Sequence, residues 1–419
     1  MKKLFLVCTF LSLISLCAGC GDQPPAVRQP TVATATLITP NLYDQDWTGL
    51  YGMDSRNGNV LWQNPAFRLP AQVVVSGTTV YMDNGYELSA LDAHRGSVLW
   101  NNMYQSQPRT QDTTLVVGQS GVYIITNSAS VAAVNWTYGE GYGNGNPAPD
   151  PAASAGSTIL SFDPSTGHLR RKQTLSFFLA VPLIDGDTIY GIGVQGTHGT
   201  LYALKGSDGS VLWQQPLLGE SLYDSLLTVA GVLYFVRNGL SGYTLSAFSL
   251  RDGQQIWHTK QMVIGSESSH LTFDGGMLYF VVDPDQLYAF KASDGTLAWT
   301  RTFPGMVSLF PGETNNGIIP ATDGHVYLVS QSTDASPLHI LALDGSTGAT
   351  IWSQVAPQSA RVFQVLIASH DYLYLGAAED NVSQVSIFVF NTMTGKLSMR
   401  YATPAESGAP DNFNFTLVA

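Results

Sequence analysis

Cysteine is nearly absent from this sequence, and the three that occur, Cys8, Cys17 and Cys20, all lie within its first 20 residues. That stretch begins with the basic Lys2 and Lys3 and continues as an apolar run over residues 4–16. The run has the length of a signal-peptide core and falls short of the roughly 20 residues that span a bilayer. Beyond residue 20 the chain therefore has no side chain for a disulfide, a thiolate metal site or a thiol nucleophile.

The apolar run ends in Leu-Cys-Ala-Gly-Cys, which resembles a bacterial lipobox with Cys20 as the lipid-bearing residue. Cys17 departs from the pattern, because Leu is the usual residue at that position. We expect cleavage after residue 19 and a lipid on Cys20. The alternative is an ordinary signal peptide cut nearby, with Cys20 left free.

The expected organisation is a signal peptide over 1–19, a proline-containing tether over 20–35 and one domain over 36–419. Basic residues are scarce. Without Lys2 and Lys3 the chain has 17 basic and 31 acidic residues, a formal net charge of −14. Such a charge argues against nucleic acid as a partner and against electrostatic binding to an anionic membrane. Membrane attachment would then come only from the lipid.

Sustained amphipathic helical patterns are also missing, and an internal repeat takes their place. Each unit begins with a segment of the type Leu-x-Ala-x-Asp, continues through a polar turn to a glycine, and has a large residue four positions after that glycine. Eight such units follow one another. Six of the eight tryptophans fall at this last position: Trp62, Trp100, Trp213, Trp257, Trp299 and Trp352. Arg171 and Met399 stand there in the third and eighth units.

The repeat predicts β-structure. Alternation with period two indicates a strand with one buried face, and the glycine supplies the positive φ of a tight turn. The third position of the segment is small in seven of the eight units, which leaves room for a Trp ring. A second strand–turn–strand motif, such as residues 75–81, precedes each unit and brings it to four strands. The repeat glycines lie 38 to 71 residues apart, and the usual spacing of about 40–50 residues per four-stranded unit is typical of a propeller.

We therefore predict an all-β protein, an eight-bladed β-propeller of four-stranded antiparallel blades, with seven blades as the alternative. Two terminal segments remain without a blade of their own, residues 36–42 and residues 413–418. We expect them to share one blade, with an outer strand of that blade contributed by the C-terminal segment.

The pattern Ala-x-Asp-x-x-x-Gly-x-x-x-Trp resembles the PQQ-like repeat of quinoprotein propellers, in which the Trp docks between adjacent blades. The resemblance covers about residues 40–419. Among lipoproteins the chain resembles the BamB family, whose members are anchored eight-bladed propellers without a cofactor. The resemblance implies the fold and leaves the function open, because enzymes and non-enzymes share the repeat.

Residues for catalysis are not apparent. The resemblance to quinoprotein dehydrogenases would imply a vicinal cysteine pair, a calcium cluster and long insertions, and the sequence shows none of these. Asp54, Asp92, Asp163 and Asp344 share one repeat position, where an Asp accepts hydrogen bonds from its own turn. The eight histidines lack ligand spacing. We predict no catalytic residue, no metal site and no cofactor.

One segment interrupts the repeat, an insertion over about residues 132–156. It is rich in Gly, Asn and Pro and carries Trp136, Tyr138 and Tyr142. Aromatic residues on a long loop are typical of binding surfaces. The alternative is a surface loop whose aromatics pack back on the ring.

Taken together, these features favour a non-catalytic, lipid-anchored envelope propeller that acts as a protein- or ligand-binding scaffold. The alternative is a PQQ-dependent oxidoreductase of the quinoprotein type. We expect an exported monomer on the extracytoplasmic side of a membrane, at the cell surface or in the periplasm. Its partner would be a protein or an envelope polymer, and the sequence does not identify it.

Overall fold

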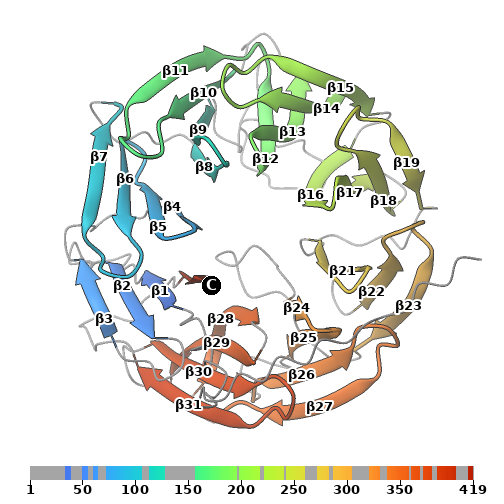
Figure 1. Ribbon diagram of the computed structural model, residues 1–419. Coiled ribbons are helices and arrows are strands. Elements are labelled where there is room, and N and C mark those ends of the chain that lie inside the picture. Colours follow the sequence, from blue (N-terminus) through green and yellow to red (C-terminus); the bar gives the residue numbers. More distant parts are fainter. Residues whose placement is uncertain are drawn as a thin grey trace, which may run out of the picture.

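A computed structural model gives the fold of the chain. It describes residues 34–38, 50–54, 60–64, 72–105, 113–127, 156–195, 198–217, 221–239, 242–259, 271–282, 286–303, 320–330, 337–357, 360–368, 371–379, 385–402 and 414–418. The regular elements in these ranges are all strands. They form eight four-stranded antiparallel sheets arranged as the blades of a propeller, one for each repeat unit in the sequence (Figure 1).

The first half of the ring contains four blades. Blade 1 is made of β1 (Thr34–Ile38), β2 (Leu50–Asp54), β3 (Val60–Asn64) and β32 (Asn414–Val418). Blade 2 is made of β4 (Gln72–Ser76), β5 (Thr79–Asp83), β6 (Glu87–Asp92) and β7 (Val98–Met103). Blade 3 is made of β8 (Thr113–Val117), β9 (Val122–Asn127), β10 (Ser157–Phe162) and β11 (Leu169–Thr174). Blade 4 is made of β12 (Phe178–Asp185), β13 (Thr188–Gln195), β14 (His198–Lys205) and β15 (Val211–Leu217).

The second half continues in the same order. Blade 5 is made of β16 (Ser221–Val229), β17 (Val232–Gly239), β18 (Gly242–Ser249) and β19 (Gln255–His258). Blade 6 is made of β20 (Thr272–Asp274), β21 (Met277–Val282), β22 (Gln286–Lys291) and β23 (Leu297–Thr302). Blade 7 is made of β24 (Ala321–Thr322), β25 (His325–Ser330), β26 (His339–Asp344) and β27 (Thr350–Val355). Blade 8 is made of β28 (Ala360–Ala368), β29 (Tyr372–Glu379), β30 (Val385–Asn391) and β31 (Leu397–Ala402).

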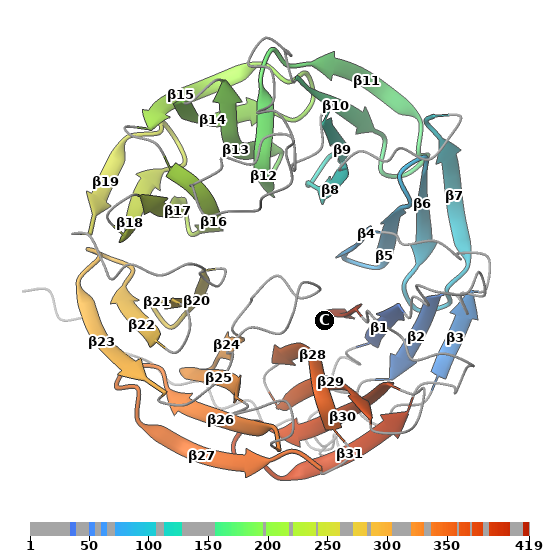
Figure 2. The same ribbon diagram turned by 180° about the vertical axis from the view of Figure 1, so that it is seen from behind.

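The ring closes within blade 1, where β1 pairs with β2 on one side and with β32 on the other. The two terminal segments thus share one blade, as the sequence predicted. The predicted position of the C-terminal strand was wrong, however. Strand β32 is at the end of the sheet opposite β3, and the chain ends near the centre of the ring (Figures 1 and 2). It is the innermost strand because β3 already occupies the outer edge.

Because each blade is a meander, its connections divide between two faces of the ring. One face carries the hairpin turns between the first and second strands and between the third and fourth strands; we call it the turn face. The opposite face carries the connections between the second and third strands and those between blades; we call it the insertion face. The insertion joins β9 to β10 and therefore leaves the ring on the insertion face.

The core of the protein lies between adjacent blades. One cluster, for example, combines Tyr81 and Leu88 of blade 2 with Leu115, Ile124 and Leu160 of blade 3. Seven clusters of this kind combine apolar residues of successive blades in the described part of the chain. Each blade is thus stabilised by burying its faces against its neighbours.

The turn between the third and fourth strands follows the predicted chemistry. Asp92 Oδ1 accepts the backbone N–H groups of residues 94 and 95, each at 2.9 Å, and Asp163 and Asp344 repeat the arrangement. Asp54 is buried, but the turn that follows it lies outside the described residues. Blades 4 to 6 lack this Asp and have one three positions later: Asp208, Asp252 and Asp294, each bonded to the residue after the glycine. These carboxylates hold turns.

Candidate functional site at the joint between blades 3 and 4

Six of the joints between blades are built around an indole ring. In each one the Trp of the outer strand donates its Nε1–H to a backbone carbonyl in the turn of the next blade. The six bonds are Trp62–Ala93 (2.9 Å), Trp100–Pro164 (2.9 Å), Trp213–Leu250 (2.8 Å), Trp257–Ala292 (3.1 Å), Trp299–Gly345 (2.9 Å) and Trp352–Thr392 (2.8 Å). Each ring buries apolar surface and also satisfies its one polar atom.

The same rings explain the repeat glycine. A Cβ on Gly167 would lie 2.3 Å from the Trp100 ring, and a Cβ on Gly96 would lie 2.2 Å from the Trp62 ring. The backbone at Gly167 also has a φ of +69°, which side chains rarely adopt. The glycine is therefore required twice, once by its own turn and once by the ring of the preceding blade.

The small residue of the repeat lies between two aromatic rings of its own blade. Ala90 is paired with Trp100 on one neighbouring strand and with Tyr81 on the other, and the two rings are 6.0 Å apart. Blades 4 to 7 repeat this Tyr–Ala–Trp row. The repeat pattern did not predict this packing role of the tyrosines. Their signal was a Tyr that recurs in the second strand: Tyr81, Tyr123, Tyr190, Tyr234, Tyr279, Tyr327 and Tyr374.

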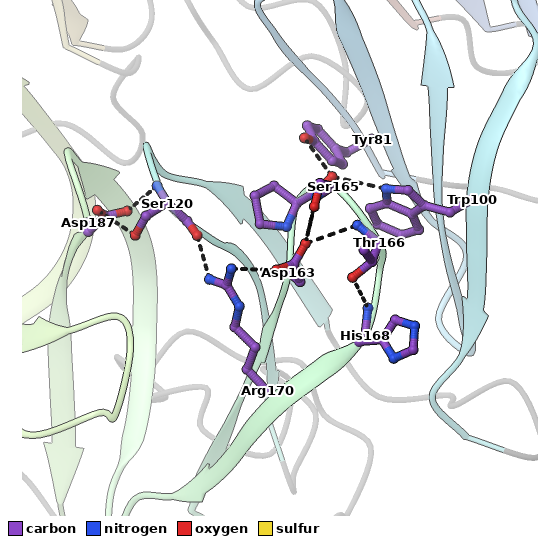
Figure 3. Close-up of polar contacts among 10 residues, drawn as sticks. Tyr81, Trp100, Ser120, Asp163, Ser165, Thr166, His168, Arg170 and Asp187 are labelled. Atoms are coloured by element: carbon purple, nitrogen blue, oxygen red, sulfur yellow. Dashed lines mark hydrogen bonds and ion pairs between the residues drawn. The ribbon is translucent and has the colours of Figure 1, made fainter.

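Trp and Tyr can converge on the same carbonyl of the next blade. Trp100 Nε1 lies 2.9 Å from the carbonyl oxygen of Pro164, and the Tyr81 hydroxyl lies 3.5 Å from it (Figure 3). Burial raises the pKa of Tyr81 above its ordinary value, and it raises that of Tyr327 in blade 7 to about 12. Both tyrosine hydroxyls therefore remain neutral over the physiological pH range.

The joint between blades 3 and 4 is built differently. Arg171 takes the Trp position on β11, and its side chain is exposed, whereas the six Trp rings are buried or half-buried. The Gln173 side chain lies against Gly209 of blade 4, where the other described repeat glycines meet a Trp ring. An apolar cluster with Tyr123, Ile125 and Leu204 still fills the interior of the joint. The joint therefore keeps its interior apolar layer but lacks the indole at its outer edge.

A polar clasp on the turn face takes over part of the connection (Figure 3). Asp187, in the first turn of blade 4, accepts the backbone N–H and the hydroxyl of Ser120 in blade 3, both at 2.7 Å. Arg170 on β11 donates to the carbonyl oxygen of Ser120 and to Asp163, both at 2.6 Å. The Ser165 hydroxyl and Arg170 together hold the pKa of Asp163 well below its usual range.

On the insertion face, the same joint holds the root of the insertion. Ser157 is fully buried at the start of β10, its hydroxyl contacts Asn127 at the end of β9, and that hydroxyl accepts the Leu179 N–H of blade 4 at 2.8 Å. Its backbone N–H donates to the Phe177 carbonyl at 2.9 Å. The segment between Asn127 and Ser157 therefore leaves the ring from a fixed base that belongs to two blades.

The inner strand of blade 4 is irregular. This strand, β12, has eight residues, and a register shift occurs between Ala180 and Leu183. Val181 within that shift has a φ of +41°, a conformation that is costly for a β-branched residue. Four residues earlier in the chain, Phe177 stacks on Tyr202 with 4.2 Å between ring centroids. The Val181 side chain packs in the cluster between blades 4 and 5, so this strain lies in blade 4 beside the joint. The joint itself is the candidate binding site because the root of the insertion and the polar clasp meet there.

Several predicted site residues lie outside the described residues. They are the lipid-bearing Cys20 and the aromatic residues of the insertion, Trp136, Tyr138 and Tyr142. Within the described ranges, no group of three or more His, Cys, Asp or Glu side chains could hold a metal ion. In the same part of the chain, no helix is long and apolar enough to cross a membrane.

Comparison with known proteins places this geometry in a family. The chain is 24% identical to the outer membrane protein assembly factor BamB of Yersinia pestis over 349 residues, which cover 76% of this chain and 77% of that protein. The structure of BamB from Moraxella catarrhalis superposes with a TM-score of 0.54 at 15% identity, over 79% of this chain and 87% of the other.

The same fold occurs in an enzyme. A quinohemoprotein alcohol dehydrogenase of Pseudomonas putida HK5 superposes with a TM-score of 0.54 at 13% identity, over 82% of this chain and 68% of the enzyme. At that level of identity the likeness shows the fold alone. The family model described as outer membrane protein assembly factor BamB matches residues 20–149, 155–267 and 243–412. The chain therefore belongs to the family of the outer membrane protein assembly factor BamB.

Proposed function

We propose that this chain is an exported, lipid-anchored scaffold that binds a protein partner during the assembly of outer membrane proteins. The family match over most of the chain carries this proposal. The related protein of Yersinia pestis is named an assembly factor and aligns with three quarters of the present chain. A ring whose joints are fixed by buried aromatic side chains suits a scaffold, because it presents its loops in constant positions.

Within the ring, the joint between blades 3 and 4 is the proposed binding region. It combines the root of the insertion at Ser157, the polar clasp of Ser120 with Asp187 and the aromatic pair Phe177–Tyr202. No other described joint combines these features. The aromatic residues of the insertion would extend this region, because they lie in the segment that joins Asn127 to Ser157.

The test is capture of a partner from solubilised envelopes with the intact lipoprotein, followed by deletion of the gene in its host. We expect one envelope protein to be captured in fixed proportion and the deletion to lower the amounts of outer membrane β-barrel proteins. Replacing residues 133–155 with a short Gly-Ser link should abolish capture and leave the melting temperature nearly unchanged, because loops tolerate length changes. Unchanged barrel proteins in the deletion strain would contradict the proposal.

Lipid anchoring is tested separately. We expect Cys20→Ala to leave the protein uncleaved or to release it from the membrane fraction, since the acyl chains would be its only attachment. Purified Cys20→Ala protein should still bind the captured partner, because Cys20 precedes the ring. If the variant partitions into detergent like the parent, the lipid is elsewhere or absent.

The second candidate function is PQQ-dependent oxidation, which the fold likeness to the quinohemoprotein dehydrogenase favours. Titration with PQQ and calcium would quench the fluorescence of the tryptophans if the quinone bound within the ring. We expect no quenching, no thermal shift and no dye-linked oxidation of alcohols or sugars. Micromolar binding with turnover would overturn the scaffold proposal in favour of the enzyme.

A further inference from the structure

The outer edge of the ring has an uneven distribution of charge. The eight outer strands of the described structure, β3, β7, β11, β15, β19, β23, β27 and β31, contain no Asp or Glu. They contain five Arg or Lys residues, and three of these are consecutive on β11: Arg170, Arg171 and Lys172. We call these three residues the basic edge. The chain as a whole has a formal net charge of −12, so this positive charge is local.

The cations of the other strands serve the fold. Arg301 donates to the Gly348 carbonyl of the next blade at 2.8 Å and lies over the Phe303 ring at 5.0 Å. Arg400 lies over the Phe388 ring at 5.8 Å. Within the basic edge, Arg170 is likewise held by Asp163 and the Ser120 carbonyl.

Arg171 and Lys172 differ from these cations. Both side chains are exposed, and neither forms a hydrogen bond or ion pair with a described residue. At the position of Arg171, six other blades have a Trp that docks on the next blade. No contact among the described residues of the fold uses these two charges.

The backbone of β11 also has an open side. It pairs with β10 only and ends the sheet of blade 3, so one row of N–H and C=O groups has no strand opposite it in the described structure. An exposed edge of this kind can accept a further strand. Lys and Arg at an edge repel basic strands, and they attract acidic ones.

We propose that β11 is the docking edge for an acidic, extended segment of the partner protein, which adds to blade 3 as a fifth strand. Arg171 and Lys172 select the partner by charge, and the open backbone supplies the hydrogen bonds. This inference rests on the proposed scaffold function and names where on the ring, and with what chemistry, a partner is held.

An extended acidic segment fits this edge better than a membrane or a nucleic acid does. A lipid surface or a duplex presents negative charge over a broad area, and the rest of this chain, with its net negative charge, would be repelled. An extended strand with adjacent acidic residues presents charge on both of its faces, which matches Arg171 and Lys172 on the opposite faces of β11. Anionic vesicles are therefore included in the test as the competing ligand.

The probe is a fluorescein-labelled peptide of nine residues in which pairs of adjacent Glu alternate with Val or Thr, so that acidic side chains lie on both faces of the added strand, and its control has Lys in place of Glu. The variant is Arg171→Glu with Lys172→Glu, which changes two exposed side chains and leaves Arg170 in place. The matched control is Leu212→Glu with Gln214→Glu on β15, where both side chains are also exposed. Fluorescence anisotropy gives the dissociation constants, and thermal melts show that all three proteins are folded.

We expect the acidic peptide to bind the parent, the β11 variant to bind it at least about tenfold more weakly, and the β15 variant to differ by less than about threefold. Added salt should weaken binding, and backbone N-methylation of the peptide should abolish it, because strand addition requires its N–H groups. Absence of parent binding, equal effects of the two variants, or stronger binding of anionic vesicles through the same residues would overturn the inference. If the captured partner binds the β11 variant as tightly as it binds the parent, the inference is also overturned, whereas the scaffold function would stand.

Discussion

Two neighbouring joints of the ring connect their blades in different ways. Between blades 2 and 3, Trp100 lies over Gly167 and donates to Pro164, so its ring both fills space and makes a hydrogen bond. Between blades 3 and 4, Arg171 turns to solvent, and Ser120 and Asp187 connect the blades on the turn face. The comparison indicates that the indole contributes at the outer edge, while the apolar layer inside the joint persists without it.

The difference has a consequence for the surface. A Trp at the outer strand uses that position for folding, and its loss leaves the position available to a partner. Blade 3 lacks the Trp and carries three cations and the insertion. The same repeat position thus serves packing in six blades and is available for binding in blade 3. A repeat protein can in this way hold a unique site without a change of architecture.

The ring closure in blade 1 gives the largest expected effect, because it joins the chain ends by main-chain pairing. Deleting residues 412–419 removes β32 and leaves β1 without the partner that it pairs with over five residues. We expect aggregation or a loss of several kcal/mol of unfolding free energy, since an unpaired edge strand is exposed. Size-exclusion chromatography and urea denaturation measure the effect. A monomer with an unchanged melting temperature would contradict this view of the closure.

The comparison of the two joints is tested directly by truncating each outer residue. Trp100→Ala should lower the unfolding free energy by about 3 kcal/mol, through the lost packing and the lost bond to Pro164. Arg171→Ala should change it by less than about 0.5 kcal/mol, because the side chain is exposed and unpaired in the described structure. Urea midpoints followed by circular dichroism give both values. Similar losses of unfolding free energy would show that Arg171 stabilises its joint as the Trp does.

These two residues also show how far sequence reasoning extends. The repeat predicted the propeller, its strands and the shared blade of the chain ends, because period-two alternation and turn glycines are local signals. It did not predict that β32 would be innermost, since the order of strands in a blade is a long-range property. Nor did it predict the clasp: Ser120 and Asp187 are 67 residues apart and belong to no repeated pattern.

The polar clasp should contribute less than an indole. Asp187→Ala leaves the Ser120 N–H and hydroxyl without their acceptor and should cost about 1 kcal/mol, because the site is partly exposed and water can replace the carboxylate. Asp185→Ala, an exposed position on the same turn, is the matched control and should be nearly neutral. A loss of unfolding free energy as large as that of Trp100→Ala would mean that the clasp stabilises its joint as much as the indole stabilises the joint between blades 2 and 3.

The smallest expected effect concerns a charge inside the Trp joint. Asp83 ends β5 and is 2% exposed, and it occupies the position that is Ile125 in blade 3 and Val236 in blade 5, two residues after the recurrent Tyr. Its Oδ1 accepts the Tyr104 hydroxyl at 2.6 Å and the Gly85 N–H at 3.0 Å, and Thr113 of blade 3 faces the same carboxyl. Burial nonetheless raises the pKa of Asp83 above its ordinary value.

A raised pKa means that the folded protein binds this proton more tightly than the unfolded chain does. As the pH rises from the unfolded pKa of about 4 through the folded pKa, Asp83 must ionise in a buried site, and its contribution to the unfolding free energy falls. Asp83→Asn keeps the accepting oxygen and removes the titration. The variant should therefore match the parent near pH 4 and equal or exceed its stability at pH 7, by at most about 1 kcal/mol. Urea midpoints across this range measure the difference. A parent that gains stability over the variant as the pH rises would show that the ionised carboxylate, and not its neutral form, fits the joint.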